Sequence, residues 1–263
     1  MTLYLIICTA SFLISVLTLF SGFGLGTLLL PLFAIFFPIE IAVAATALVH
    51  LVNNIFKFFL VGRFANFKIT ALFSVPAILS AAFGAWLLTQ IGTLPVLASY
   101  ALSNHVFQVE PIKLVIGVLI FVFALFELIP ALGRISVAPK YIPLGGLLSG
   151  FFGGLSGMQG ALRSLFLIRA GLSKEQYIGT CVASAILVDC SRILVYGYVI
   201  WGQHLAILST SNLEYLILAA ILAAITGSLL SSRLLEKTTL STVQKIVGGL
   251  LILISIGLMG GLF

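Results

Sequence analysis

The chain has 263 residues, of which 61% are hydrophobic and only 8% are charged, and its mean hydropathy is +1.28. A water-soluble domain carries about 25% charged residues, so the composition excludes an ordinary soluble protein and indicates an integral membrane protein. The formal net charge of +6 therefore concerns orientation in the bilayer and not binding to nucleic acid.

Two long apolar stretches are each interrupted near the middle by glycine and serine. The first runs from Leu3 to Phe37 and is broken between Ser21 and Gly26. The second runs from Tyr141 to Ile168 and is broken between Ser149 and Gly160. Interrupted apolar segments at matching places in two halves are typical of transporter binding sites. Because Met1 to Phe20 lacks a basic region and a clean cleavage site, we interpret it as a retained membrane segment.

Six further apolar segments are long enough to be membrane-spanning helices. They are approximately Ile41–Gly62, Ile69–Ile91, Leu114–Ile129, Gln176–Trp201, Leu213–Leu234 and Ile246–Leu262. The predicted fold class is therefore an all-α polytopic membrane protein. Cys8, Cys181 and Cys190 lie in apolar segments without a CxxC pair, so neither a disulfide framework nor a thiolate metal site is indicated. No cofactor and no metal are expected.

Lysine and arginine gather in four of the connecting segments. These hold Arg63 and Lys68, then Arg134 and Lys140, then Arg169 and Lys174, and last Arg233, Lys237 and Lys245. The segment from Gly92 to Pro111 has none. Because cytoplasmic loops are enriched in Lys and Arg, the four basic segments should share the inner side.

This placement fixes how the two interrupted stretches meet the membrane. The stretch from Tyr141 to Ile168 begins and ends beside inner loops, so it either crosses twice as short spans or enters as a re-entrant hairpin. If the membrane crossings are counted back from the inner loops, the stretch from Leu3 to Phe37 begins and ends on the outer side. An eight-span arrangement, in which both stretches cross once, would scatter the basic loops over both faces.

The two halves also resemble each other at an offset of about 135 residues. Asn54 then falls on Asp189, and Lys57 falls on Arg192. We predict two homologous, inverted transmembrane repeats, residues 1–135 and 136–263. Each would contain one glycine-broken segment and about three spanning helices.

The glycine clusters have two interpretations, which can hold together. The patterns Gly146-x-x-x-Gly150 and Gly153-x-x-x-Gly157 suit close packing of helices. The clusters could also unwind the helix at mid-membrane. That would expose the N-terminus of a half-helix beginning near Thr27 or Gln159, where free N–H groups and the helix dipole favour an anion.

Charged residues inside apolar segments are functional candidates, because placing one at the bilayer centre costs at least about 2.5 kcal/mol. Arg163 lies six residues past Gly157. Asp189 and Arg192 share a helix face and are either substrate or coupling groups, or a structural ion pair. Near Arg163 stand polar residues that usually serve packing in membrane helices: Ser156, Gln159, Ser164 and Ser184.

A polar stripe follows one face of the segment from Ile41 to Gly62. It consists of His50, Asn53, Asn54 and Lys57, at positions i, i+3, i+4 and i+7. Lys57 lies about 9 Å from the inner end by helical rise, so its ammonium could instead extend to the lipid headgroups. His50 could likewise be an interhelical hydrogen-bonding residue without a proton role.

The run from Ser149 to Lys174, SGFFGGLSGMQGALRSLFLIRAGLSK, resembles the TauE/SafE sulfite-exporter family of membrane permeases. The run SGFGLGTLLLPL from Ser21 to Leu32 and its partner LVNNIFKF from Leu51 to Phe58 resemble it too. The resemblance covers nearly the whole chain and implies export or uptake of small sulfur-containing anions, such as sulfite or organosulfonates. Arg163 and Ser164 stand where the family usually has proline, which adds a cation.

We therefore predict a transporter that moves a small sulfur-containing anion by alternating access at a midplane site. Export is the default direction, because an interior-negative potential drives anions outward by about 2.3 kcal/mol per charge per 100 mV. His50 and Asp189 are candidates for coupling a proton. The predicted substrate-binding residues are Arg163, Arg192, Gln159, Gly157, Gly160, Ser164, Gly24, Gly26, Thr27, Asn53, Asn54 and Lys57.

Two other functions remain open at this point, a membrane-embedded enzyme and an anion channel. The chain has no HExxH, no G-x-S-x-G and no paired acidic metal motif, and a channel leaves the two broken segments unexplained. The expected partners are the anion and the lipid bilayer of the cell (inner or plasma) membrane, with no nucleic acid. The residues do not decide between a monomer and a homodimer.

Overall fold

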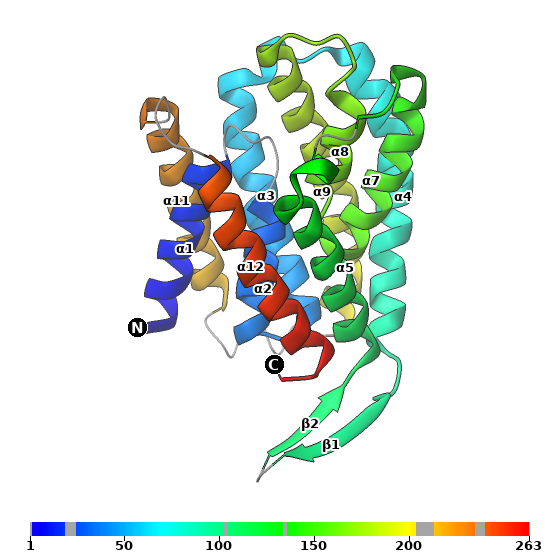
Figure 1. The fold of residues 1–263 in the computed structure, drawn as a ribbon, viewed down its shortest axis with the longest axis vertical. Helices are drawn as coiled ribbons and strands as arrows, with labels where there is room; N and C mark the ends of the chain where they lie inside the picture. The colour runs from blue at the N-terminus through cyan, green and yellow to red at the C-terminus, as the bar shows by residue number, and fades with distance from the viewer. Residues whose placement is uncertain are drawn as a thin grey trace.

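The computed structural model describes residues 2–18, 25–102, 105–133, 136–203, 213–234 and 240–262. These residues form a helical bundle with a β-hairpin at one end (Figure 1). The helices are α1 Thr2–Thr18, α2 Leu25–Phe36, α3 Ile39–Val61, α4 Phe67–Gly92, α5 Pro111–Leu128, α6 Pro130–Gly133, α7 Ile142–Ser156, α8 Gly160–Leu167, α9 Lys174–Gln203, α11 Leu213–Leu234 and α12 Leu240–Met259. Two 3-10 turns, η1 Gly62–Phe64 and η2 Pro139–Tyr141, precede α4 and α7.

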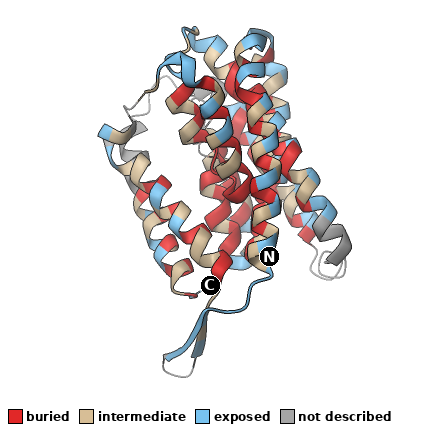
Figure 2. Ribbon diagram, turned by 90° about the vertical axis from the view of Figure 1, so that its right-hand side faces the viewer, coloured by how far each residue is buried: buried red, intermediate tan, exposed pale blue. Residues whose placement is uncertain are grey.

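Four helices of the described chain are long and apolar enough to cross a membrane. They are Ile39–Phe64, Phe67–Gly92, Lys174–Tyr198 and Leu213–Leu230. The apolar parts of the two other predicted spans, in α5 and α12, are shorter. Buried residues fill the centre of the bundle (Figure 2), while large apolar side chains such as Leu79 and Leu194 point outward, as expected beside lipid. The prediction of a helical, multi-pass membrane protein is confirmed.

The all-α class needs one correction, a β-hairpin between α4 and α5. β1 (Ala98–Leu102) pairs antiparallel with β2 (His105–Val109), in the segment expected to be only a connection. Aromatic and β-branched residues favour strands. Tyr100 stacks on Phe107 across the pair, with ring centroids 5.5 Å apart. The Tyr100 hydroxyl also donates to the carbonyl oxygen of Gly260, which ties the hairpin to the end of the chain.

Helices α7 and α8 form a hairpin that enters and leaves the bundle at the same end (Figure 1). They are antiparallel, because a Cβ at Gly145 would lie against Phe166 and the Ser149 hydroxyl donates to the carbonyl of Gln159. Their 15 and 8 residues span about 22 and 12 Å, less than the roughly 30 Å of a bilayer core. Of the two alternatives left by the basic loops, these short lengths favour the re-entrant hairpin.

Helices α1 and α2 form the corresponding pair at the opposite end of the bundle (Figure 1). The chain starts at that end and returns to it before α3 begins. The two pairs meet inside the protein, where a Cβ at Gly26 would lie 3.0 Å from the carbonyl oxygen of Gly157. The two glycine breaks are therefore in direct contact.

Glycines of α7 bring its backbone against the backbone of α4. A Cβ at Gly146, Gly150 or Gly154 would lie 1.9 to 2.2 Å from a carbonyl oxygen of α4, a distance that no side chain tolerates. The predicted small-residue packing is thus present at Gly146 and Gly150, and its third member is Gly154, not Gly153. In the other half α1 packs on α11 through Gly227. Each half thus supplies the packing surface for the other's hairpin, while the repeat boundaries remain a prediction.

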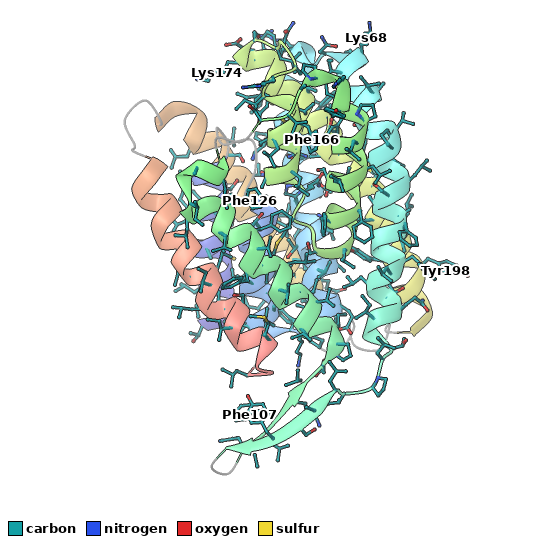
Figure 3. All side chains as sticks on the ribbon, turned by 45° about the vertical axis from the view of Figure 1, so that its right-hand side comes forward. Lys68, Phe107, Phe126, Phe166, Lys174 and Tyr198 are labelled. Atoms are coloured by element: carbon teal, nitrogen blue, oxygen red, sulfur yellow. The ribbon has the colours of Figure 1, made fainter. Side chains whose placement is uncertain are left out.

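Basic residues of the predicted inner segments lie at one end of the bundle, whereas Lys113 follows the β-hairpin at the other end. Figure 3 shows Lys68 and Lys174 at the end opposite to Phe107 of the β-hairpin. Lys140 belongs to the same end, because it precedes α7 and α7 runs parallel to α4. Arg134 and Lys237 lie outside the described residues.

This arrangement predicts which engineered cysteines share a side of the membrane. In a variant without the native cysteines, Lys68→Cys, Lys140→Cys and Lys174→Cys should react with an impermeant maleimide only from the inner face. Ser99→Cys in the exposed hairpin should react only from the outer face. Labelling of the Lys140 and Lys174 positions from opposite faces would contradict the re-entrant hairpin.

Candidate functional site

Three helices supply charged and amide side chains to the centre of the bundle, next to the point where the glycine breaks meet. Each of these side chains is at most 7% exposed. They are called here the central cluster: His50, Asn54 and Lys57 of α3, Gln159 and Arg163 at the start of α8, and Asp189 and Arg192 of α9. The α3 members share one face because they are spaced by four and three residues.

Asp189 is the hub of the cluster. Its Oδ1 accepts hydrogen bonds from Nε (3.0 Å) and Nη2 (2.8 Å) of Arg192 and from Nε2 of Gln159 (3.0 Å). Its Oδ2 lies 2.6 Å from Nδ1 of His50. A carboxylate that is completely buried requires this many donors to replace its hydration. The same atoms tie α9 to α3 and to the start of α8.

Gln159 connects Asp189 to Arg163. While its Nε2 donates to Asp189, its Oε1 accepts from Nη1 of Arg163 at 3.1 Å. Gln159 is the N-cap residue of α8, yet its side chain makes no capping hydrogen bond. Instead, the Gln159 side chain links Arg163 to Asp189, and Asp189 in turn binds Arg192.

Gly157, at the break itself, must be glycine for two reasons. Its φ of 79° is in the left-handed region, and a Cβ there would lie 2.7 Å from Nη1 of Arg192. The guanidinium therefore reaches the buried backbone of the break. Among the described residues, this Nη1 has no hydrogen-bond partner, although Arg192 is completely buried. A buried charged donor without an acceptor is costly and marks a place for an anionic oxygen.

The central cluster carries more positive than negative charge. Lys57, Arg163 and Arg192 give three positive charges against one negative charge at Asp189, so the sum is +2 when His50 is neutral. Lys57 is 6% exposed and close enough to Arg163 for their charges to interact. The interpretation that Lys57 extends to the headgroups is therefore wrong. An excess of buried positive charge within this cluster favours a bound anion.

Some residues near Arg163 were not expected from the sequence. The Tyr177 hydroxyl donates to Oγ of Ser164 (2.9 Å), and Cys181 is buried beside Arg163. Tyr177 and Cys181 precede Ser184, itself expected from the sequence, at the spacing i, i+4 and i+7 on one face of α9. That period could have identified them.

Several predicted site residues have other partners. Asn53 accepts from the Ser228 hydroxyl (2.9 Å), and Ser228 lies 2.7 Å from Oγ of Ser15, so this amide faces α11 and α1. Ser164 donates to the carbonyl of Gly160 and accepts from Tyr177. The buried residues Gly26, Thr27 and Gly160 lie at the first turns of α2 and α8. Gly24 lies outside the described residues.

The comparisons with known proteins point to one family. The family model described as Sulfite exporter TauE/SafE matches residues 7–258, nearly the whole chain. No curated protein matches the chain, and no solved structure does. In the described part of the chain no group of three or more His, Cys, Asp or Glu could hold a metal ion.

The hub role of Asp189 predicts a large and non-additive stability effect. Asp189→Asn leaves the buried Arg192 without a counter-charge, so the free energy of unfolding should fall by about 3 to 5 kcal/mol. Adding Arg192→Gln should restore part of this loss, because no unpaired charge remains at the pair. Thermal unfolding in detergent measures both, with the exposed Glu175→Gln of the same helix as control. Additive losses in the double variant would argue against the pair.

Proposed function

The chain belongs to the TauE/SafE sulfite exporter family, and on that premise we propose that it exports a small, doubly charged sulfur anion such as sulfite. The family is one of membrane transporters of sulfur anions and not of enzymes. The membrane in question is proposed to be the cell membrane. We propose the substrate, the direction of transport and the mechanism from the geometry and charge of the site.

The excess of buried positive charge is the observation that supports this proposal. A bound dianion brings the sum of +2 to zero, whereas a monoanion leaves one charge uncompensated. Arginine presents a planar fork of N–H groups that matches the oxygens of sulfite or a sulfonate. Nη1 of Arg192 beside Gly157 supplies one such donor. Arg163 and Lys57 supply further charge on the inner side of the break.

The backbone at the two breaks would complete the site. The first turns of α2 and α8 begin at Leu25 and Gly160, next to the contact between Gly26 and Gly157. Helix N-termini favour anions through their free N–H groups and dipole. Gln159 and Asn54 would orient the substrate, while Asn53 and Ser164, which have other partners, would act as packing residues.

Alternating access would come from movement of one half against the other. The hairpins α1–α2 and α7–α8 enter from opposite ends (Figure 1), and α3 and α9 face each other across the central cluster. A rocking motion of these two halves could open the site to either end in turn. An interior-negative membrane potential would drive a dianion outward with twice the force on a single charge, about 4.6 kcal/mol per 100 mV.

A counterflow screen in proteoliposomes tests the substrate. Sulfite, thiosulfate, sulfate, sulfoacetate and the monoanion methanesulfonate are each offered outside vesicles that contain labelled sulfite. We expect sulfur dianions to exchange and methanesulfonate to exchange much more slowly, because it leaves buried charge uncompensated. Equal exchange of methanesulfonate and sulfite would contradict the dianion site. Absence of exchange with every anion, in correctly folded protein, would contradict the transport function itself.

Arg163 is predicted to contact the substrate. Arg163→Gln should weaken anion binding at least about tenfold, since losing one charge-assisted hydrogen bond costs about 1.5 to 3 kcal/mol. Arg163→Lys should recover only part of the affinity, because ammonium keeps the charge but not the fork. The matched control is Arg169→Gln, at an exposed position six residues on. Wild-type affinity in a well-folded Arg163→Gln protein would move the site toward Arg192.

A further inference from the structure

His50 stands at the centre of the protein, but holding the anion does not require it. Its ring lies beside the contact between the two breaks, with Cδ2 3.7 Å from the position of a Cβ on Gly26. It also links the halves, because His50 belongs to α3 and its partner Asp189 to α9. The proton affinity of a titratable group in this position depends on whether an anion is bound and on how α3 packs against α9.

The hydrogen bonds of His50 assign the role of each ring nitrogen. Nδ1 lies 2.6 Å from Oδ2 of Asp189, so Nδ1 carries a hydrogen and donates it, because the carboxylate already accepts from Arg192 and cannot donate. The amide nitrogen of Asn54 donates to the carbonyl oxygen of His50 at 2.9 Å. That same amide nitrogen lies 3.1 Å from Nδ1 and 3.3 Å from Nε2, and it is the partner that the described residues offer to Nε2. In neutral His50, Nε2 is then an acceptor with a long, weak contact.

A proton can therefore bind at Nε2 without breaking the bond to Asp189. Carboxylate pairing at Nδ1 is the arrangement that stabilises an imidazolium in catalytic dyads. Once protonated, Nε2–H faces the donor group of Asn54 and needs an acceptor. A bound oxyanion next to Gly157 supplies one.

The surrounding charges link this proton to the anion. The charges that act on His50 are those of Asp189 and Arg192 of α9 and of Arg163 of α8. On its own helix α3, Lys57 lies seven residues further on. The charged groups at the ends of the packed elements are exposed; they are Arg63, Lys68, Lys174, Glu175 and Glu214. The neutral titratable groups of α9 are Tyr177, Cys181 and Tyr196. With the site empty, an imidazolium raises the sum from +2 to +3. With a dianion bound, the sum is only +1.

We propose that His50 takes up one proton at Nε2 each time the site binds its anion, so that proton and anion cross the membrane together. This inference rests on the proposed function. The proton comes from water on the loading side, or from the O–H of hydrogen sulfite, whose O–H bond breaks as the N–H bond forms. On the release side the N–H bond breaks, and the proton returns to water or to sulfite. Asp189 positions the ring and keeps its own charge throughout.

The coupling remains compatible with export. A dianion with one proton carries a net charge of −1, so an interior-negative potential still drives it outward, with half the force on the bare dianion. Reciprocal linkage requires that a pH gradient then drives the anion as well. A carrier of the anion alone has no such property.

The test uses thiosulfate, or sulfoacetate if the screen shows no thiosulfate exchange, because neither changes its charge near neutral pH. Proteoliposomes with the full chain, a trapped pH-sensitive dye and the membrane potential clamped at zero receive a pH gradient of about one unit. The wild-type protein should accumulate the anion on the alkaline side, up to about tenfold for one proton per anion, while the dye reports proton movement. Addition of the anion without a pH gradient should also move protons.

His50→Gln should lose the gradient-driven accumulation and the dye signal, while counterflow exchange stays measurable, because the amide can donate to Asp189 but cannot bind a proton. His105→Gln, the same change in the exposed β-hairpin, should behave as the wild type. If His50→Gln does not fold, the wild-type experiment alone tests whether proton and anion movement are coupled. Wild-type exchange without accumulation or proton movement would overturn the coupling and leave the transport function standing. Persistent proton movement in folded His50→Gln would overturn the role of His50.

Discussion

The ion pair between Asp189 and Arg192 is the interaction on which the rest of the structure depends. Both side chains are completely buried, and burying charge in a membrane protein is tolerated only where the charge is paired and hydrogen-bonded. Asp189 reaches this state by drawing in Gln159 from the break before α8 and His50 from α3. The carboxylate thus holds together the re-entrant hairpin and the central helices α3 and α9. It does not, however, balance all the positive charge that surrounds it.

Glycine connects this electrostatic centre to the fold. Where Gly26 meets Gly157, the two hairpins approach each other by backbone alone, and Arg192 reaches the break because Gly157 has no side chain. Where Gly146 and Gly150 meet α4, the hairpin is held by backbone contact along its length. The same residue type therefore serves tight packing against α4 and a bent, polar backbone at the centre. The packing interpretation of the glycine clusters is confirmed, and the interruption of the helix at Gly157 is present, while anion binding at the break remains a proposal.

Hydropathy predicts Arg163, Asp189 and Lys57 as site candidates, because these charged residues are conspicuous inside apolar segments. It also predicts the spanning helices, while the placement of Lys and Arg predicts the basic end and the re-entrant option. Sequence periodicity could not decide which neighbour each polar residue meets. Asn53 and Asn54 are adjacent in the chain, but a helix turns by about 100° per residue. Asn53 therefore bonds to Ser228, whereas Asn54 bonds to His50. The bridging role of Gln159 depends on a backbone break, and strand propensity in the hairpin was overlooked beside the stronger apolar signal.

We propose that the buried excess of positive charge is the binding site of a doubly charged anion. The most direct measurement is the unfolding temperature of the purified wild-type protein in detergent, titrated with thiosulfate and, at matched ionic strength, with chloride. A ligand that binds only the folded state at about 100 times its Kd stabilises it by about 2.7 kcal/mol. We expect the unfolding temperature to rise saturably with thiosulfate, and we expect chloride not to reproduce this rise. An unfolding temperature that responds identically to both salts would contradict it.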